Sequence, residues 1–371
     1  MKSPYALIAT VLALCLATSA ALAQTPFTVV KTPNPNPHGY QNGLSSISGS
    51  SPSDIWAVGQ SVLHFNGKKW MAFSAPDIDG GAVNNLESVV DVAPNNVWAV
   101  GYVNLDEDNP GQLIEHYDGT AWSIDPGPQI PTGDVPYLES VTAISASDIW
   151  ATGSILIYPG QAFFPLFEHY DGTAWTAETE GFFDTFMFGI SADATNDVWA
   201  VGTGGAANHY DGNTWNVVPM TVPGLGENAL FSVTALAPNN VWAVGFYVEQ
   251  QDESRPRITL IEHWDGKSWQ VVSSPNPGGS ANSNVLYGIT SISANDIWAY
   301  GASLNIASDL QSTLVLHWDG NSWTVVPSPD TPKGRPDTHF LFGGTVFPTG
   351  DLWLVGGYGF LKSFVLNATG Q

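Results

Sequence analysis

A six-residue motif that recurs along the chain constrains its fold more than any other feature of the sequence. The motif first occurs at Asp54–Gly59, as Asp-Ile-Trp-Ala-Val-Gly. Its seven copies lie about 50 residues apart and are centred on Trp56, Trp98, Trp150, Trp199, Trp242, Trp298 and Trp353. A second motif, His-Tyr-Asp-Gly-Thr-Ala-Trp at His116–Trp122, has six copies that begin at His64, His116, His169, His209, His263 and His317. Self-similarity at this period indicates a repeat architecture with one supersecondary unit per repeat.

Each repeat has the pattern of four short strands. In the third repeat we expect strands at Leu138–Ala143, Ile149–Gly153, Leu166–Tyr170 and Ala174–Ala177. Asp171-Gly172 separates the last two, and this dipeptide favours a tight hairpin. Four antiparallel strands at this period are typical of a β-propeller blade. The sequence therefore predicts an all-β, seven-bladed propeller that fills residues 24–371 as a single domain.

The two ends of the chain indicate how the ring closes. The last repeat reaches Phe364–Gly370, which matches Leu314–Gly320 of the preceding repeat, and then stops before a fourth strand. Near the N-terminus, Phe27–Pro33 reproduces Trp323–Pro329, the fourth strand of that repeat. We expect the N-terminal strand to complete the seventh blade, because this pairing covers strand edges that would otherwise be open.

On these two motifs the chain resembles the kelch family and other secreted bacterial propellers. The resemblance covers the whole repeat region. It departs from kelch at the end of the second strand, where only Gly356-Gly357 forms a glycine pair. Kelch-like propellers serve as interaction platforms and as enzyme scaffolds, so the resemblance implies a fold and leaves both functions open.

Residues 1–23 have the pattern of a secretory signal peptide. A short basic start precedes the apolar stretch Tyr5–Leu16, and Ala21–Ala23 fits a signal peptidase site. We expect cleavage there to give a secreted or periplasmic chain that begins at Gln24. The single cysteine, Cys15, lies within this segment, so we expect no disulfide and no cysteine nucleophile in the mature chain.

An excess of carboxylates over basic side chains excludes two classes of partner. The 371 residues include 10 Lys and Arg against 34 Asp and Glu, which gives a formal net charge of −24. Nucleic acids and anionic lipid head groups are bound through Lys and Arg. We therefore expect no nucleic acid or membrane partner, and we expect a monomer.

The repeated Trp and His residues are interpreted as structural. Strict periodicity favours packing of the Trp rings between blades. One His per blade is unable to converge on a single metal ion, because neighbouring sheets stand about 10 Å apart. We expect these histidines to be hydrogen-bonded core residues.

The residue eleven positions before each motif Trp changes character, while its neighbours hardly change. Leu or Met precedes it, and Ser or Gly follows it. These channel-mouth residues should surround the start of the innermost strands. They are Ser45, Glu87, Glu139, Phe188, Phe231, Tyr287 and Phe342. We expect a mouth with an acidic side and an aromatic side, suited to a sugar or a peptide. The alternative is that these side chains pack between blades.

Segment lengths indicate which face of the propeller is functional. The segment from the motif Gly to the motif His has 5, 15, 16, 7, 18 and 16 residues in the first six repeats, whereas the other turn lengths within a repeat are constant. Binding residues concentrate on loops of a rigid scaffold, so we expect the ligand on this long-loop face. Arg255 and Arg257 lie in the longest segment, where they could bind a carboxylate or pair with nearby acids.

We interpret the chain as a non-catalytic binding module for a carbohydrate or protein ligand. The alternative is a carbohydrate-active hydrolase or lyase at the same face. Glu87 and Glu139 on adjacent blades would suit an inverting glycosidase. His38 and His339, in segments that lead into neighbouring blades, would suit a metal or a lyase. No metal-binding motif is present and no cofactor is expected, although Ca²⁺ could bind the carboxylates of Asp106–Asp108 or of Glu249, Asp252 and Glu253.

Overall fold

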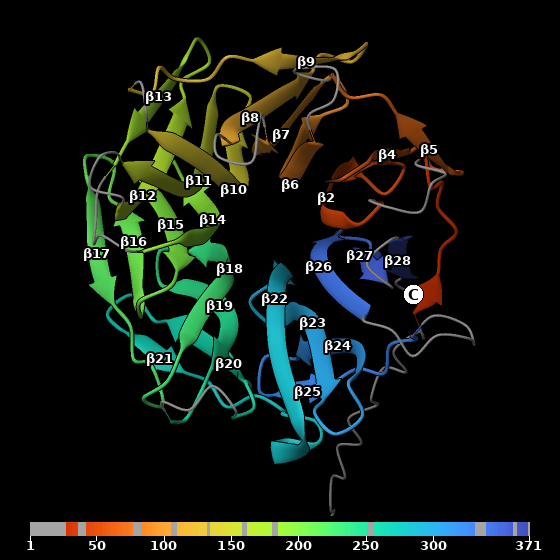
Figure 1. Ribbon diagram of the computed structural model, residues 1–371, viewed down its shortest axis with the longest axis vertical. Helices are drawn as coiled ribbons and strands as arrows, with labels where there is room; N and C mark the ends of the chain where they lie inside the picture. Colours follow the sequence, from red (N-terminus) through yellow and green to blue (C-terminus); the bar gives the residue numbers. More distant parts are fainter. Residues whose placement is uncertain are drawn as a thin grey trace, which may run out of the picture.

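The computed structural model describes residues 27–35, 42–76, 83–104, 110–131, 134–157, 162–179, 185–250, 255–330, 339–358 and 362–369. They form seven four-stranded antiparallel sheets arranged as the blades of a ring (Figure 1). The innermost strand of every blade contributes to the wall of a central channel. The predicted fold class, an all-β propeller with four strands per blade, is confirmed. The predicted signal peptide lies outside the described residues.

The strands of each blade are given from the channel outwards. Blade 1 consists of β2(Leu44–Ser51), β3(Asp54–Gly59), β4(Val62–Phe65) and β5(Trp70–Phe73). Blade 2 consists of β6(Val83–Ala93), β7(Asn96–Asn104), β8(Pro110–Tyr117) and β9(Trp122–Asp125). Blade 3 consists of β10(Val135–Ser145), β11(Asp148–Ile157), β12(Ala162–Tyr170) and β13(Trp175–Glu178). Blade 4 consists of β14(Met187–Ala194), β15(Asp197–Gly202), β16(Ala206–Tyr210) and β17(Trp215–Pro219). Blade 5 consists of β18(Asn228–Ala237), β19(Asn240–Tyr247), β20(Ile258–Trp264) and β21(Trp269–Val271). Blade 6 consists of β22(Asn282–Ser293), β23(Asp296–Asn305), β24(Leu310–Trp318) and β25(Trp323–Val325). Blade 7 consists of β26(His339–Val346), β27(Leu352–Tyr358), β28(Lys362–Ala368) and β1(Thr28–Val29).

Blade 7 shows that the predicted ring closure is correct. Thr28 pairs with Asn367 and Val29 with Leu366, so β1 is the outermost strand of the sheet that ends the chain. The backbone N–H of Val30 continues the ladder and donates to the carbonyl oxygen of Val365 over 2.8 Å. Phe27 is buried in the core between blades 6 and 7. The two ends of the chain therefore share one sheet and one core.

The core lies between blades, because the second strand of each blade is buried on both faces. In blade 2, Val97 and Ala99 pack with Trp56 of blade 1, whereas Trp98 and Val100 pack with residues of blade 3. Successive side chains of a strand point to opposite faces of the sheet, so a continuous apolar run serves both interfaces. The expected packing of the motif Trp rings between blades is confirmed.

In blades 2 to 6 an Asp or Asn side chain joins the motif Trp to the motif His of the same blade. In blade 3, Asp148 Oδ1 accepts hydrogen bonds from Trp150 Nε1 and from His169 Nε2, both over 2.9 Å, and the two rings stack with centroids 4.0 Å apart. Blades 2 and 5 have Asn at the position of Asp148, and an amide oxygen only accepts, so the imidazole donates through Nε2. All six motif histidines contact the Asp or Asn of their own blade, as expected for hydrogen-bonded core residues. In blade 1 only the histidine does so, and Trp56 Nε1 has no hydrogen-bond partner within the described residues.

The variation in segment length is largely a variation in strand length. In blade 3 the hairpin of β11 and β12 pairs continuously from Ile149 opposite Tyr170 to Ile157 opposite Ala162. In blade 1, β3 ends at Gly59 and β4 begins at Val62. The expectation of long loops is therefore corrected. In several blades the second and third strands extend beyond this face as a hairpin, because their pairing continues through most of the longer segment. The predicted strands of the third repeat are likewise two to four residues too short at several ends.

Among the described residues, the helical structure is one three-residue turn, η1(Gly279–Ala281). No helix in this part of the chain has the length and apolar character needed to cross a membrane.

Candidate functional site

The channel-mouth residues share one backbone feature, a β-bulge at the start of the innermost strand. In blade 2 the register with β7 jumps from Leu86 to Ser88, which leaves Glu87 as the extra residue. The same irregularity occurs at Glu139 and at every other channel-mouth position. A bulge leaves the extra residue unpaired and redirects its side chain. It therefore presents this position towards the channel, while the preceding Leu or Met stays in the core.

The glycine that ends each Trp-Ala-Val-Gly motif is required by this bulge. A Cβ atom added to Gly101 would lie 1.9 Å from the carbonyl oxygen of Asn85, two residues before Glu87. At Gly153 the corresponding distance, to the carbonyl oxygen of Tyr137, is 1.8 Å. No side chain fits such a gap. The repeated glycine and the repeated bulge are thus two parts of one arrangement.

The residue after the bulge connects adjacent blades. The Ser88 hydroxyl accepts a hydrogen bond from the backbone N–H of Val141 in blade 3, over 3.1 Å. Ser46 and Ser140 make the equivalent contact to the next blade. At Gly343 the blades approach so closely that an added Cβ would lie 2.7 Å from the Cα of Ser46. These contacts hold the innermost strands, and with them the channel-mouth side chains, in fixed positions.

The bulged residues line one cavity, the mouth of the central channel. Its volume is about 590 Å³, and its wall includes all seven channel-mouth residues. The four aromatic members form an unbroken arc. Centroid distances are 5.1 Å from Phe188 to Phe231, 5.3 Å from Phe231 to Tyr287 and 5.1 Å from Tyr287 to Phe342. Phe342 is 38% exposed, so the arc is accessible from the channel.

Glu87 and Glu139 form the acidic side of the same cavity. Burial and, to a smaller extent, the negative charge of Glu87 raise the pKa of Glu139 to about 8. The pKa of Glu87 is also raised by burial, with a smaller opposing effect from its hydrogen bond with Ser45. Because the two carboxyl groups repel each other when ionised, a cation placed between them would be stabilised.

Three aromatic residues beside this mouth were not singled out by the sequence analysis. Tyr102 and Tyr137 stack edge to face beside the acidic pair, with centroids 6.0 Å apart, and both glutamates raise the pKa of Tyr102. Phe340 stacks on Phe342 with centroids 5.4 Å apart. A signal was present: Tyr102 follows the motif glycine, and the other two precede a bulged residue by two positions. In a regular strand, residues i and i−2 share a face, and a bulge breaks this alternation. The alternation of residues therefore did not predict that these aromatic side chains lie beside the channel-mouth residues.

Arg257 extends the aromatic arc towards the outside of the ring. Its guanidinium lies 4.2 Å from the centroid of the Phe246 ring, which in turn lies 5.9 Å from Phe231. Its Nη2–H donates to Glu227 Oε2 over 3.3 Å, between exposed side chains. The predicted pairing with a nearby acid is therefore present. Arg255 and Arg257 line a second pocket of about 380 Å³, beside the channel mouth.

The other predicted site residues fall elsewhere. His339 is not a surface histidine of an inter-blade segment: it is 4% exposed, begins β26, and stacks near Tyr358. It is buried because β26 starts earlier than expected. His38, Asp106–Asp108, Asp252 and Glu253 lie outside the described residues. Within the described ranges, no group of three His, Cys, Asp or Glu is arranged to hold a metal ion.

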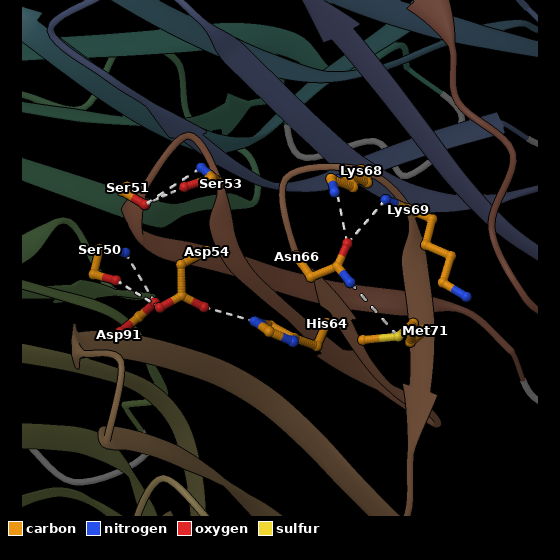
Figure 2. A network of polar contacts seen from close by, with 10 residues as sticks. All are labelled: Ser50, Ser51, Ser53, Asp54, His64, Asn66, Lys68, Lys69, Met71 and Asp91. Atoms are coloured by element: carbon orange, nitrogen blue, oxygen red, sulfur yellow. Dashed lines mark hydrogen bonds and ion pairs between the residues drawn. The ribbon is translucent and has the colours of Figure 1, made fainter.

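A polar network on the opposite, tight-turn face contains Ser, Asp and His but not in the order of a hydrolase triad (Figure 2). Ser50 donates its hydroxyl to Asp54 Oδ2 over 3.1 Å, and His64 Nε2 contacts Asp54 Oδ1 over 2.6 Å. A triad needs the imidazole between hydroxyl and carboxylate. Asp91 joins the network by accepting from the Ser50 backbone N–H over 2.9 Å, which ties blade 2 to blade 1. The network is structural.

Comparison with known proteins shows the fold and leaves the family open. No protein-family model matches the chain, and no curated protein is similar to it in sequence. Among solved structures, it is similar to YCF48 bound to D1 peptide, with a TM-score of 0.57, 15% identity, and coverage of 95% of this chain and 99% of that one.

Two further structures are similar at the same level. RRP9 WD40 repeats give a TM-score of 0.59, 10% identity, and coverage of 93% and 99% of the two chains. The extracellular domain of BT4673 from B. thetaiotaomicron gives 0.57, 12% identity, and coverage of 92% of this chain and 39% of that chain. The chain is thus a seven-bladed propeller, and its resemblance to kelch repeats stays a prediction.

Proposed function

We propose that this propeller is a binding module and that its channel mouth binds a peptide segment of another protein. The observation that carries the proposal is the division of one cavity into an aromatic arc and an acidic pair, each held by β-bulges. Such a cavity suits a bulky apolar side chain next to a Lys or Arg side chain. YCF48, one of the similar structures, is bound to a D1 peptide, which agrees with a peptide ligand on this fold.

The geometry of the arc favours a peptide over a carbohydrate. Successive rings are tilted by 47°, 45° and 56°, so together they form a cup. A sugar ring stacks on one flat aromatic face, whereas a cup surrounds a branched or aromatic side chain. A carbohydrate ligand is therefore an outcome of the test below.

We infer where this module acts, and which partners it lacks, from the sequence. The signal-peptide pattern of residues 1–23 supports a secreted or periplasmic module. The net charge of −24 supports a function that does not involve nucleic acid or anionic membranes. We propose that the module is a monomer.

Selection of displayed peptides tests the proposal. A library of random dodecapeptides is selected on immobilised mature protein, residues 24–371, and on a Phe231→Ser variant. We expect enrichment of peptides that join an aromatic or aliphatic residue to Lys or Arg, and loss of this enrichment in the variant. Val325→Ser is the matched control, because Val325 is 47% exposed on the outermost strand of blade 6, away from the channel.

Two results contradict the proposal. The first is an enrichment that is the same for Phe231→Ser as for wild type. The second is the absence of any enriched peptide together with retention on insoluble polysaccharide, which would identify a carbohydrate ligand.

A second candidate, a glycoside hydrolase, rests on one observation. A carboxyl group whose pKa is raised to about 8, as that of Glu139 is, can act as a general acid beside a second carboxyl group such as Glu87. New reducing ends released from a polysaccharide, and lost in Glu139→Gln, would favour the enzyme. Release that persists in this variant would exclude Glu139 as the acid.

A further inference from the structure

The pocket that contains Arg255 and Arg257 is built between blades 5 and 6. The backbone N–H of Arg257 donates to the Ser283 hydroxyl over 3.1 Å, and its carbonyl oxygen accepts from the backbone N–H of Asn284 over 2.8 Å. These two bonds join the start of β20 to the start of β22. The pocket wall is therefore held by backbone contacts across the blade interface.

The pocket concentrates positive charge on an acidic protein. The chain has 10 Lys and Arg against 34 Asp and Glu, yet two guanidinium groups line this one pocket. The Phe246 ring covers one face of the Arg257 guanidinium. A guanidinium has five N–H donors, and the bond to Glu227 uses one of them. Arg257 can therefore bind a further carboxylate in the bidentate geometry that guanidinium favours.

The same pocket also has acceptors in its wall. Asn284 is 1% exposed, and its Nδ2 donates to the carbonyl oxygen of Pro277 over 3.2 Å. Its Oδ1 is buried and accepts no hydrogen bond within the described residues. A buried acceptor without a donor is costly, but less than 1 Å² of this oxygen is exposed, so a ligand does not reach it in this conformation. Glu249 is an exposed acceptor in the wall.

The pocket lies beside the aromatic arc, and Phe246 lies between the two. Arg257 lies over Phe246, Phe246 lies against Phe231, and the charge of Arg257 acts on Tyr287 by lowering its pKa against the larger effect of burial. A chain segment whose apolar side chain occupies the arc would therefore reach this pocket with its next residues.

We propose that this pocket binds a peptide carboxylate, with the guanidinium of Arg257 as the main donor and Glu249 as acceptor for a peptide N–H. The inference rests on the proposed function, because the ligand is the same peptide that occupies the channel mouth. The carboxylate is supplied by an Asp or Glu side chain or by a chain end. The ligand thus makes two charged contacts. A basic residue of the peptide binds Glu87 and Glu139, and a carboxylate binds Arg257 across the ring.

Four tetrapeptides test the pocket by calorimetric titration of the mature protein. They are Ac-Phe-Ala-Ala-Glu-NH₂ with a side-chain carboxylate, Ac-Phe-Ala-Ala-Gln-OH with a terminal one, Ac-Phe-Ala-Ala-Gln-NH₂ with none, and Ac-Phe-Ala-Ala-Lys-NH₂ with a positive charge. We expect at least one carboxylate peptide to bind about tenfold more tightly than the neutral peptide. Which of the two does so distinguishes a side chain from a chain end.

Three variants assign the effect to the pocket. Arg257→Gln should abolish the tenfold preference for carboxylate. Lys267→Gln removes one positive charge from a tight turn of the same blade and should leave the preference unchanged. Glu227→Gln removes the carboxylate that competes for Arg257 and should increase the preference.

The outcomes separate this inference from the proposed function. Equal binding of all four peptides that is lost in Phe231→Ser would overturn the carboxylate pocket and leave the peptide-binding function standing. A carboxylate preference that survives Arg257→Gln would also overturn the pocket. If none of the four peptides binds, the inference is wrong whatever the displayed library shows.

Discussion

Glu115 offers a quantitative test of how the blades pack. Its side chain is fully buried, and neither carboxyl oxygen has a hydrogen-bond partner within the described residues. It lies on β8 opposite Ala99, on the face of blade 2 that packs against blade 1. Burial raises its pKa from an ordinary value of 4.5 to about 8. The folded protein therefore holds this proton over a pH range in which the unfolded chain releases it.

The direction of the effect on stability follows from this shift. Between pH 4.5 and 8 the folded state binds more protons than the unfolded state, so the free energy of unfolding falls as the pH rises. One pKa unit corresponds to about 1.36 kcal/mol. The shift at Glu115 therefore lowers the free energy of unfolding by close to nothing at pH 4, by about 3 kcal/mol at pH 7 and by about 5 kcal/mol at pH 9. Glu168 and Glu262 occupy the same position in other blades, and their pKa values are also raised to about 8.

The perturbation is Glu115→Gln, which keeps the shape of the side chain and removes its ionisation. Urea unfolding is measured at several pH values from 5 to 9. We expect the wild type to lose stability with rising pH and the variant to lose less, so that the variant is the more stable by about 3 kcal/mol at pH 7. Leu63 and Leu316 stand at this position in blades 1 and 6, so Glu115→Leu should behave similarly.

Asp118→Asn is the matched control. Asp118 is an exposed turn residue of the same blade, and its pKa is lowered by hydrogen bonds from the backbone N–H groups of Ala121 and Thr120. Asn66 serves this turn in blade 1, so the substitution removes a charge without removing the turn. Its effect on the pH dependence should lie below pH 4. A wild-type stability that is flat from pH 5 to 8, or a Glu115→Gln slope equal to that of wild type, would refute the reasoning.

Three further predictions concern the scaffold, and thermal or urea unfolding checks each of them. Gly356→Ala places a Cβ 1.8 Å from a carbonyl oxygen of β26 and should destabilise by several kcal/mol, whereas Gly357→Ala, whose Cβ would meet nothing within 3.5 Å, should be tolerated; equal effects would contradict the role of the bulge. Asp148→Ala leaves two ring N–H donors without their acceptor and should cost about 2–3 kcal/mol, but Asp148→Asn should retain most of the stability, as Asn does in two other blades. Phe27→Ala should cost about 3 kcal/mol by emptying the closing core, and Phe27→Trp, the residue of the six other blades, should cost less; an unchanged melting temperature for Phe27→Ala would refute ring closure by the N-terminal strand.

The architecture was predictable from the sequence because its signals are local and repeated. Alternation along strands, Asp-Gly turns such as Asp171-Gly172, and the spacing of the motif Trp residues each act over a few residues and occur in nearly every blade. Repetition makes weak local signals reliable. The match of Phe27 to the Trp of other repeats was enough to predict ring closure.

The grouping of the channel-mouth residues was also visible in the sequence, for a topological reason. Equivalent positions of a propeller lie on a circle, so Glu87 and Glu139 are neighbours because their blades are neighbours. The sequence analysis could not show that a β-bulge presents them to the channel, since a bulge depends on the register between two strands.

Only the tertiary structure decided the features that depend on distances between blades. It placed Arg257 over Phe246, beside the aromatic arc, and it buried Glu115 and His339, whose burial was not predicted from the sequence. Burial, pKa shifts and close contacts arise from the packing of segments that are far apart in the chain. The repeat period and the turn residues can be identified from the sequence directly, whereas burial, pKa shifts and contacts between blades exist only in the folded protein.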